Sequence, residues 1–246
     1  MKDLFSAQAG LYAQYRPVYP QDLYDFILEQ VLRKDAALDC ATGNGQVARA
    51  LSSRFRNVRA IDISENQLRH APCLPNVEYS VHPAEHTPFD DDSFDLITVA
   101  QAYHWLDGQK FSREARRVGR SGAVVAVWGY DIPTSDSTVD SIVRRWNFEM
   151  LAPYWEPERH HLYKHFEDQP FEFEPITAPG FRIVVDWGKE ELVGNLKTWS
   201  ALQRMVREVG EGAFNEVVGK IKAVWDDGQK KRFTYPVFVK LGRVTK

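Results

Sequence analysis

A glycine-containing turn and two aspartates carry the clearest chemical signal in this 246-residue sequence. The turn Gly43-Asn44-Gly45 follows the apolar run Ala36–Cys40, and Asp62 stands near the end of a second run that begins at Val58. Glycines let a backbone approach a ligand closely and adopt φ values that a Cβ disfavours. A carboxylate at the end of such a run can accept two hydrogen bonds from ribose hydroxyls. Together these residues predict a site for a nucleoside.

Asp39 precedes the turn and distinguishes two kinds of nucleoside ligand. The stretch 43–48 also fits the loose dinucleotide pattern, with Asp62 close to the expected offset of about 20 residues. A carboxylate beside the turn repels a pyrophosphate at a helix N-terminus, whereas it attracts an ammonium group. No Lys or Arg stands in the turn to offset it. The charge pattern therefore favours S-adenosylmethionine over NAD, and an NAD-dependent oxidoreductase stays open as the alternative.

Apolar runs and helical spacings alternate around these residues. We expect helices over Gln46–Arg54, Ser64–Ala71 and Leu106–Arg117, and strands over Ala36–Cys40, Val58–Ile63, Asn76–Ser80, Phe94–Ala100, Gly122–Gly129, Phe181–Trp187 and Arg232–Leu241. Strands that alternate with helices predict parallel pairing with right-handed crossovers. The expected fold is doubly wound α/β with a mostly parallel, seven-stranded, Rossmann-like sheet, whose last two strands close one edge. Ligands of such sheets bind beyond the carboxyl ends of the strands.

A single domain over residues 1–246 accounts for the chain, with two additions to the sheet. Residues 1–20 carry four aromatic side chains and two prolines, and we interpret them as an N-terminal lid. Residues 131–179 are rich in Trp, Tyr, Glu, Pro and His, and we expect a helical insertion over the active site, with helices near Thr138–Met150 and Glu158–Phe166. Further helices are expected over Lys189–Val209 and Ala213–Asp226.

Composition and charge narrow the class of partner. The chain is 43% hydrophobic with a formal charge of -3, and Cys40 and Cys73 are its only cysteines. This argues against disorder, a disulfide framework and the basic surface of a nucleic-acid-binding protein. The longest apolar run, Ala123–Trp128, is far short of the roughly 20 residues that span a bilayer. We expect a cytoplasmic protein, monomer or homodimer, that acts on a small molecule and binds neither nucleic acid nor membrane.

Several motifs together are similar to one enzyme family. Leu38–Gly45, Ala60–Ser64, Ala84-Glu85 and Ser93–Ile97 resemble the successive motifs of class I S-adenosylmethionine-dependent methyltransferases. Tyr15–Pro20, Gln101–Trp105 and Thr198–Ser200 resemble the branch that includes trans-aconitate methyltransferase and carries the methyltransferase type 11 domain. One departure is Ala41, where the family usually has glycine.

The resemblance implies S-adenosyl-L-methionine as cofactor, S-adenosyl-L-homocysteine as product and a set of cofactor-binding residues. The methionine end would be lined by Asp39, Ala41, Gly43 and Gly45, the ribose held by Asp62, the adenine contacted by Ile63, Ala84 and Glu85, and the sulfonium underlaid by Ala100 and Gln101. Each of these residues stands at or just after the end of an expected strand.

The candidate catalytic residues are His104, Tyr15 and Arg16. His104 follows the fourth expected strand, where it either orients or deprotonates an acceptor or only packs against cofactor and lid. Arg16 is the cation expected to meet an anionic acceptor or the cofactor's own carboxylate. Tyr15 belongs to the aromatic lid. His161 and His165 lie one helical turn apart but lack an evident third ligand, so no metal is expected.

The sequence therefore predicts methyl transfer from S-adenosylmethionine to a small-molecule acceptor. Relatives that methylate small carboxylic acids favour a carboxylate acceptor and O-methylation. A non-catalytic S-adenosylmethionine-binding protein remains a further alternative.

Overall fold

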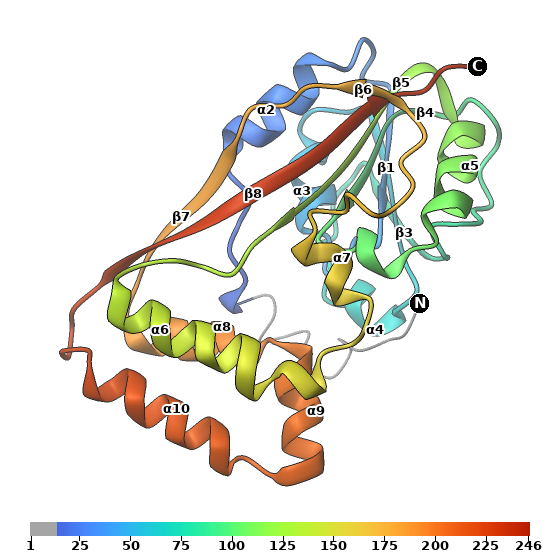
Figure 1. The fold of residues 1–246 in the computed structure, drawn as a ribbon. Helices are drawn as coiled ribbons and strands as arrows, with labels where there is room; N and C mark the ends of the chain where they lie inside the picture. Colours follow the sequence, from blue (N-terminus) through green and yellow to red (C-terminus); the bar gives the residue numbers. More distant parts are fainter. Residues whose placement is uncertain (1–13) are drawn as a thin grey trace.

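The centre of the molecule, in a computed structural model that describes residues 14–246, is an eight-stranded sheet. Its strand order is β3-β2-β1-β4-β5-β8-β6, and β7 pairs with β8 beyond this path (Figure 1). The strands are β1 (Ala36–Cys40), β2 (Asn57–Asp62), β3 (Val77–Val81), β4 (Phe94–Ala100), β5 (Gly119–Tyr130), β6 (Glu174–Ile176), β7 (Phe181–Trp187) and β8 (Lys231–Arg243).

Pairing is parallel from β3 through β5, and β8 then runs antiparallel to β5, β6 and β7. The predicted α/β fold and mostly parallel sheet are thereby confirmed. The predicted number of seven strands is wrong, because the short β6 lies inside the expected helical insertion and pairs with β8. A three-residue strand that contains Pro175 is too short to show a two-residue alternation.

Helices cover both faces of the sheet. On β1, Ala37 belongs to the core cluster under α2 (Gln21–Glu29) and α3 (Gln46–Ser52), whereas Leu38 belongs to the cluster under α5 (Gly108–Val118). Figure 1 shows α5 on the opposite side of the sheet from α2 and α3. Successive side chains of a strand point to opposite faces of the sheet, so a continuously apolar strand is buried on both faces. This two-sided burial holds the strand ends in a fixed plane.

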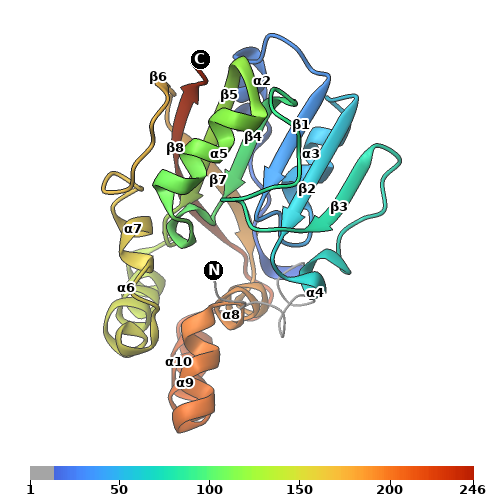
Figure 2. The ribbon, with the colours of Figure 1, turned by 90° about the vertical axis from the view of Figure 1, so that its right-hand side faces the viewer.

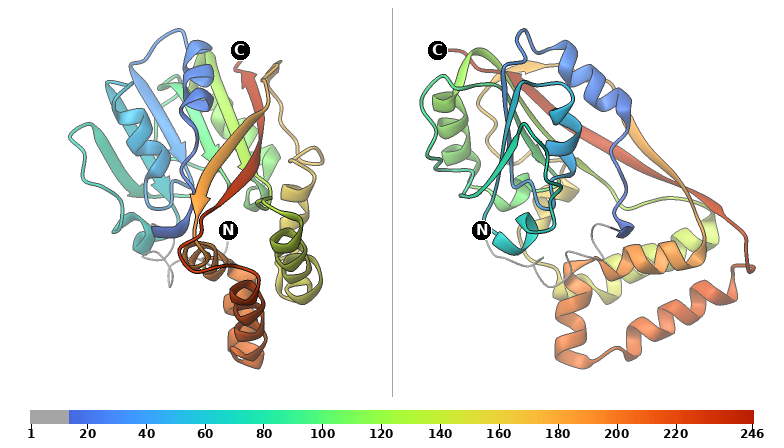
Figure 3. Two further views of the ribbon diagram at one scale, coloured as in Figure 1. Left: turned by 90° about the vertical axis from the view of Figure 1, so that its left-hand side faces the viewer. Right: turned by 180° about the vertical axis from the view of Figure 1, so that it is seen from behind.

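A third group of helices gathers beyond the carboxyl ends of the parallel strands, as Figures 2 and 3 show. It consists of α6 (Ser137–Arg145), a π-helical turn η3 (Trp146–Met150), η4 (Ala152–Tyr154), α7 (Arg159–Tyr163), α8 (Lys189–Lys197), α9 (Ser200–Val209) and α10 (Gly212–Ala223). The expected insertion at 131–179 therefore supplies only part of this helical layer. Residues 189–223 supply the rest, and α10 packs against both α6 and α8.

The helix expected over Lys189–Val209 is interrupted. Thr198 Oγ1 donates a 2.6 Å hydrogen bond to the carbonyl oxygen of Asn195, and the extended backbone of Trp199 then starts α9. The Trp199 side chain is buried, so tertiary packing overrides the helical spacing at this point.

The first described residues, before α2, contact α3 and β5. Gln46 Nε2 donates a 3.1 Å hydrogen bond to the carbonyl oxygen of Pro17, and the Tyr19 ring packs edge-on against Trp128. Most of the expected lid, including Phe5 and Tyr12, lies outside the described residues. Within residues 14–246, none of the helices combines the length and apolar character needed to cross a membrane.

Candidate functional site

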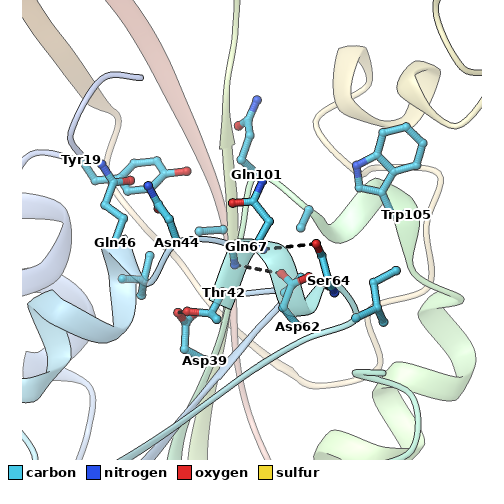
Figure 4. Close-up of a pocket in the computed structure, with 16 residues that line it drawn as sticks. Tyr19, Asp39, Thr42, Asn44, Gln46, Asp62, Ser64, Gln67, Gln101 and Trp105 are labelled. Atoms are coloured by element: carbon cyan, nitrogen blue, oxygen red, sulfur yellow. Dashed lines mark hydrogen bonds between the residues drawn. The ribbon is translucent and has the colours of Figure 1, made fainter. Parts of the chain in front are cut away.

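A pocket opens where β1, β2 and β4 end, and Figure 4 shows the side chains that line it. Asp39, Thr42 and Asp62 lie at its base, with Tyr19 and Gln46 on one side and Trp105 on the other. The remaining wall residues are Ala41, Gly43, Asn44, Val47, Ile63, Ser64, Gln67, Ala100, Gln101 and Ala102. Among the described residues of this wall, two are carboxylates and none is Lys or Arg.

The turn between β1 and α3 takes its shape from left-handed backbone. Ala41, Gly43 and Gly45 have φ values of 52°, 57° and 79°. A Cβ at Gly45 would lie 2.8 Å from Tyr79 Oη, so this position requires glycine for space as well as conformation. Ala41 adopts the same region with a side chain, which costs conformational energy. The turn thus holds its backbone against the pocket under strain.

Asp39 is buried at the base of the turn and ties three elements together. Its Oδ2 accepts hydrogen bonds from Thr42 Oγ1 (2.5 Å) and the Ala48 amide (3.2 Å), and its Oδ1 accepts one from Thr98 Oγ1 (2.7 Å). Burial raises the pKa of Asp39 to about 6, in spite of these hydrogen bonds. Asp39 therefore caps α3 and, above pH 6, presents a negative charge at the pocket wall.

Asp62 ends β2 and holds the turn from the other side. Its Oδ2 accepts a 2.8 Å hydrogen bond from the Gly43 amide, and its Oδ1 accepts a 2.9 Å bond from the Ser64 amide. Ser64 in turn caps α4 (Glu65–Leu68), because its Oγ accepts from the Gln67 amide. One carboxylate thus fixes the first turn, the end of β2 and the start of α4.

Seven of the ten predicted cofactor-binding residues line this pocket. They are Asp39, Ala41, Gly43, Asp62, Ile63, Ala100 and Gln101. The other three lie outside the wall. Gly45 is the N-cap of α3, Ala84 is buried in the core under α5, and Glu85 accepts a 3.1 Å hydrogen bond from the Asp107 amide.

Sequence reasoning missed nine residues of the pocket wall. Thr42, Asn44, Gln46 and Val47 lie inside the stretch 41–48 around the predicted turn. Tyr19, Ser64, Ala102 and Trp105 lie inside the other quoted motifs, so adjacency could have indicated these eight residues. Nothing in the spacing indicates Gln67.

A pair of smaller cavities adjoins the pocket, and we call this pair the side chamber. Both cavities are lined by Arg16, Gln101, Arg159 and Leu162. One is completed by Tyr130, Asp131, Ile132, Pro133, Tyr163, Asn195, Trp199 and Tyr235, the other by His104, Trp105, Trp155, Glu156 and Ser200. Gln101 also lines the main pocket, so its side chain stands at the boundary between pocket and side chamber.

Gln101 is held firmly at this boundary. Its φ is 54°, its own amide donates to the Trp128 carbonyl, and its Oε1 accepts a 2.8 Å hydrogen bond from the Tyr130 amide. Two strand ends, β4 and β5, therefore fix its position. Non-glycine residues with left-handed backbone are found preferentially at functional sites.

The three predicted catalytic residues are not brought to one place. His104 and Arg16 line the side chamber, and Arg16 Nη1 donates a 2.8 Å hydrogen bond to Tyr130 Oη. Tyr15 borders neither cavity of the side chamber nor the main pocket, because its ring packs against α8, where a Cβ on Gly194 would come within 2.5 Å of it.

His104 is a buried, neutral imidazole. Burial, with the nearby charges of Arg159 and His161, lowers the pKa of His104 to about 3. Its Nδ1 has no hydrogen-bond partner among residues 14–246, and its ring lies 4.5 Å from that of Trp105. At neutral pH it can accept a hydrogen bond, but so acidic an imidazolium makes it a weak proton acceptor.

Histidines in α7 and just after it lie beside carboxylates. His161 Nδ1 lies 2.7 Å from Asp168 Oδ1, and His165 Nε2 lies 3.1 Å from Asp131 Oδ1, so these two histidines face different partners. Potential ligand atoms of His160, His161 and Asp168 lie within 4.8 Å of one another, but Lys164 Nζ also lies 3.0 Å from Asp168. Asp168 thus already bridges three cationic or polar side chains.

Comparison with known proteins fits this geometry. Residues 38–127 match the family described as methyltransferase domain. The chain is 36% identical to a protein of known structure from Anaeromyxobacter dehalogenans that is described as a type II methyltransferase, with a TM-score of 0.86 over 94% of this chain and 99% of that one. The chain therefore belongs to the class I S-adenosylmethionine-dependent methyltransferases.

Two further relatives agree with this assignment. A protein of Dictyostelium discoideum described as a methyltransferase is 26% identical over 98% of this chain and 95% of its own length. An uncharacterized methyltransferase of Mycobacterium tuberculosis is 37% identical, over 50% of this chain and 51% of its own. Both matches are thus to proteins described as methyltransferases.

Proposed function

We propose that this chain transfers the methyl group of S-adenosylmethionine to a small molecule bound in the side chamber, with a carboxylate as the favoured acceptor group. The observation that carries this proposal is the junction at Gln101, which lines the pocket and both cavities of the side chamber. A methyl donor in the pocket and an acceptor in the side chamber would meet at Gln101. Methyl transfer needs such alignment of two ligands.

The pocket wall fits S-adenosylmethionine better than a dinucleotide. Its charged groups are Asp39 and Asp62, and the absence of Lys and Arg from the described wall leaves nothing to neutralise a pyrophosphate. Asp39 would face the ammonium group, directly or through water, and Asp62 the ribose hydroxyls. Ile63 would contact the adenine, while Ala100 and Gln101 would border the sulfonium.

S-adenosylmethionine supplies an electrophilic methyl carbon, which bonds to an acceptor lone pair as its bond to sulfur breaks and the electron pair returns to sulfur, leaving S-adenosylhomocysteine. The residues of the chain then have to align the two ligands and exclude water. An ionised carboxylate needs no base. A hydroxyl must lose its proton, and His104 with a pKa of about 3 is poorly suited to take it. This favours an acceptor that is already ionised, with His104 as an orienting group.

Parallel calorimetric titrations with S-adenosylmethionine, S-adenosylhomocysteine and NAD test the donor. We expect saturable one-to-one binding of the first two and none of NAD. An acceptor screen with a tritiated methyl donor then tests turnover, with small carboxylic acids as the first panel. Binding of NAD alone would favour the oxidoreductase, and donor binding without any product would favour a non-catalytic binder.

A further inference from the structure

Arg159, a residue that the sequence did not single out, provides a second guanidinium group in the side chamber. It starts α7 and lines the same two cavities as Arg16. Burial and the charge of nearby Arg16 lower the pKa of Arg159, as expected for two cations that share a partly buried space. Two cations that line the same cavities favour an anionic ligand there.

The surroundings of Arg159 fix its side chain. Its Nε donates a 2.8 Å hydrogen bond to Tyr163 Oη, and its guanidinium lies 3.6 Å from the centre of the Trp155 ring. Tyr163 is itself held by Asn147, whose Nδ2 donates to Tyr163 Oη at 3.1 Å. A stacked and hydrogen-bonded guanidinium has few remaining rotamers, so its outer edge points in one direction.

No side chain of the described part of the chain neutralises this group. Among residues 14–246, Arg159 makes no ion pair, and its two Nη atoms make no hydrogen bond. The carboxylates that line the side chamber have cationic or imidazole neighbours of their own: Asp131 lies 3.1 Å from His165, and Glu156 lies 4.0 Å from Arg204. Partly buried charges are normally paired in proteins. The Nη1–Nη2 edge matches the fork geometry that binds a carboxylate with two hydrogen bonds.

We propose that Arg159 and Arg16 bind an anchoring carboxylate of the acceptor, and that this carboxylate is distinct from the group that is methylated. Arg159 lines the side chamber but not the main pocket, so a group bound to it lies away from the methyl donor. A carboxylate held by guanidinium groups has also lost much of its nucleophilicity. The acceptor then carries at least two functional groups, one held at Arg159 and one that reaches Gln101.

This inference rests on the proposed function, because it takes the side chamber as the acceptor site. It adds a specific demand on the acceptor: a second group besides the carboxylate. An acid with no such group would bind as a competitor and would not be methylated.

The test measures binding of simple probes to protein saturated with S-adenosylhomocysteine. A series of carboxylates from acetate to phenylacetate, each paired with its neutral amide, is titrated by calorimetry into the wild type, Arg159→Gln and Arg145→Gln. Arg145 is an exposed residue at the end of α6 and pairs with Glu149, which makes it a matched charge control. We expect at least one acid to bind at least tenfold more tightly than its amide, and Arg159→Gln to abolish that preference, while Arg145→Gln keeps it.

Each other outcome has a definite meaning. If the wild type binds S-adenosylhomocysteine but prefers no acid over its amide, or if Arg159→Gln keeps the preference, the anchoring role is wrong and the proposed function stands. If the wild type does not bind S-adenosylhomocysteine, the proposed function itself fails. Melting curves and S-adenosylhomocysteine affinity of Arg159→Gln, both expected to match the wild type, exclude misfolding.

Discussion

The pocket and the side chamber share Gln101 and Trp105 but are built in different ways. The pocket is negative, and its two carboxylates are fixed by backbone amides and hydroxyls of β4, α3 and the turns that follow β1 and β2. The side chamber has two guanidinium groups, from residues 16 and 159, which are far apart in the chain, and its two carboxylates have cationic or imidazole neighbours of their own. The pocket wall is thus set by strand ends, whereas the side chamber depends on how the helical layer packs. Substrate specificity can then vary through the helical layer without disturbing the donor site.

The largest effect that would distinguish the two regions is expected from Asp62→Ala. It removes a carboxylate that we expect to accept two charge-assisted hydrogen bonds from the ribose hydroxyls. At about 1.5 kcal/mol for each bond, S-adenosylmethionine affinity should fall roughly 100-fold, and at least tenfold. Calorimetry measures the affinity. Asp62→Asn, which keeps one acceptor oxygen, should lose less, and Arg159→Gln should lose nothing. Unchanged affinity in Asp62→Ala would remove the ribose assignment.

His104, in the side chamber, predicts a pH effect on the stability of the fold. Its pKa of about 3 in the folded protein lies below the unfolded value of about 6.5, so between these values only the unfolded chain takes up the proton. The contribution of neutral His104 to stability is therefore lost as pH falls from 6.5 towards 3. Between pH 6.5 and 5 this amounts to roughly 2 kcal/mol of the free energy of unfolding.

Urea denaturation at pH 6.5 and pH 5 measures this loss in the wild type and in His104→Phe, a variant that cannot titrate. The difference between the two proteins separates the titration of His104 from that of the other histidines of the chain. Equal pH dependence in both would mean that His104 is protonated at an ordinary pKa, and that its ring is more hydrated than its burial indicates.

Asp39 predicts a smaller pH effect on the pocket alone. Its pKa of about 6 means that roughly a tenth of the carboxyl groups are ionised at pH 5 and nine tenths at pH 7. If the ionised form attracts the ammonium group, S-adenosylmethionine affinity should rise roughly tenfold over this range. Asp39→Asn should bind more weakly at pH 7 and show a flat profile. A flat wild-type profile would leave Asp39 only its role as the cap of α3.

The same contrast explains what the sequence could predict. Strand ends with glycine or aspartate locate the pocket, because parallel strands bring their carboxyl ends to one edge. Seven predicted residues therefore line one wall. Ala84 and Glu85 follow a strand end as well, but Glu85 turns to the Asp107 amide and Ala84 into the core, and spacing carries no information on side-chain direction.

Arg159 could not have been predicted, because its role depends on contacts between segments that are distant in the chain. Its stacking on Trp155, its bond to Tyr163 and its nearness to Arg16 arise only after α7 docks over the strand ends. The short strand β6 was missed for a related reason, since pairing with β8 and not local pattern defines it. Local rules thus predict the pocket, and tertiary packing decides the side chamber.

The smallest expected effect concerns the strain in the turn of the pocket. Ala41 has a φ of 52°, where an L-residue pays roughly 1–2 kcal/mol that glycine does not. Ala41→Gly also makes the unfolded chain more flexible, which offsets about 0.5–1 kcal/mol of that gain. The free energy of unfolding should therefore rise by roughly 0.5–1 kcal/mol, a shift of about 1–4 °C in melting temperature for a domain of this size.

Calorimetric melting measures this shift. Ala71→Gly is the control, because Ala71 has no positive φ, and this variant should melt lower than the wild type. If Ala41→Gly also melts below the wild type, packing of the Ala41 methyl group stabilises the turn by more than its left-handed backbone costs.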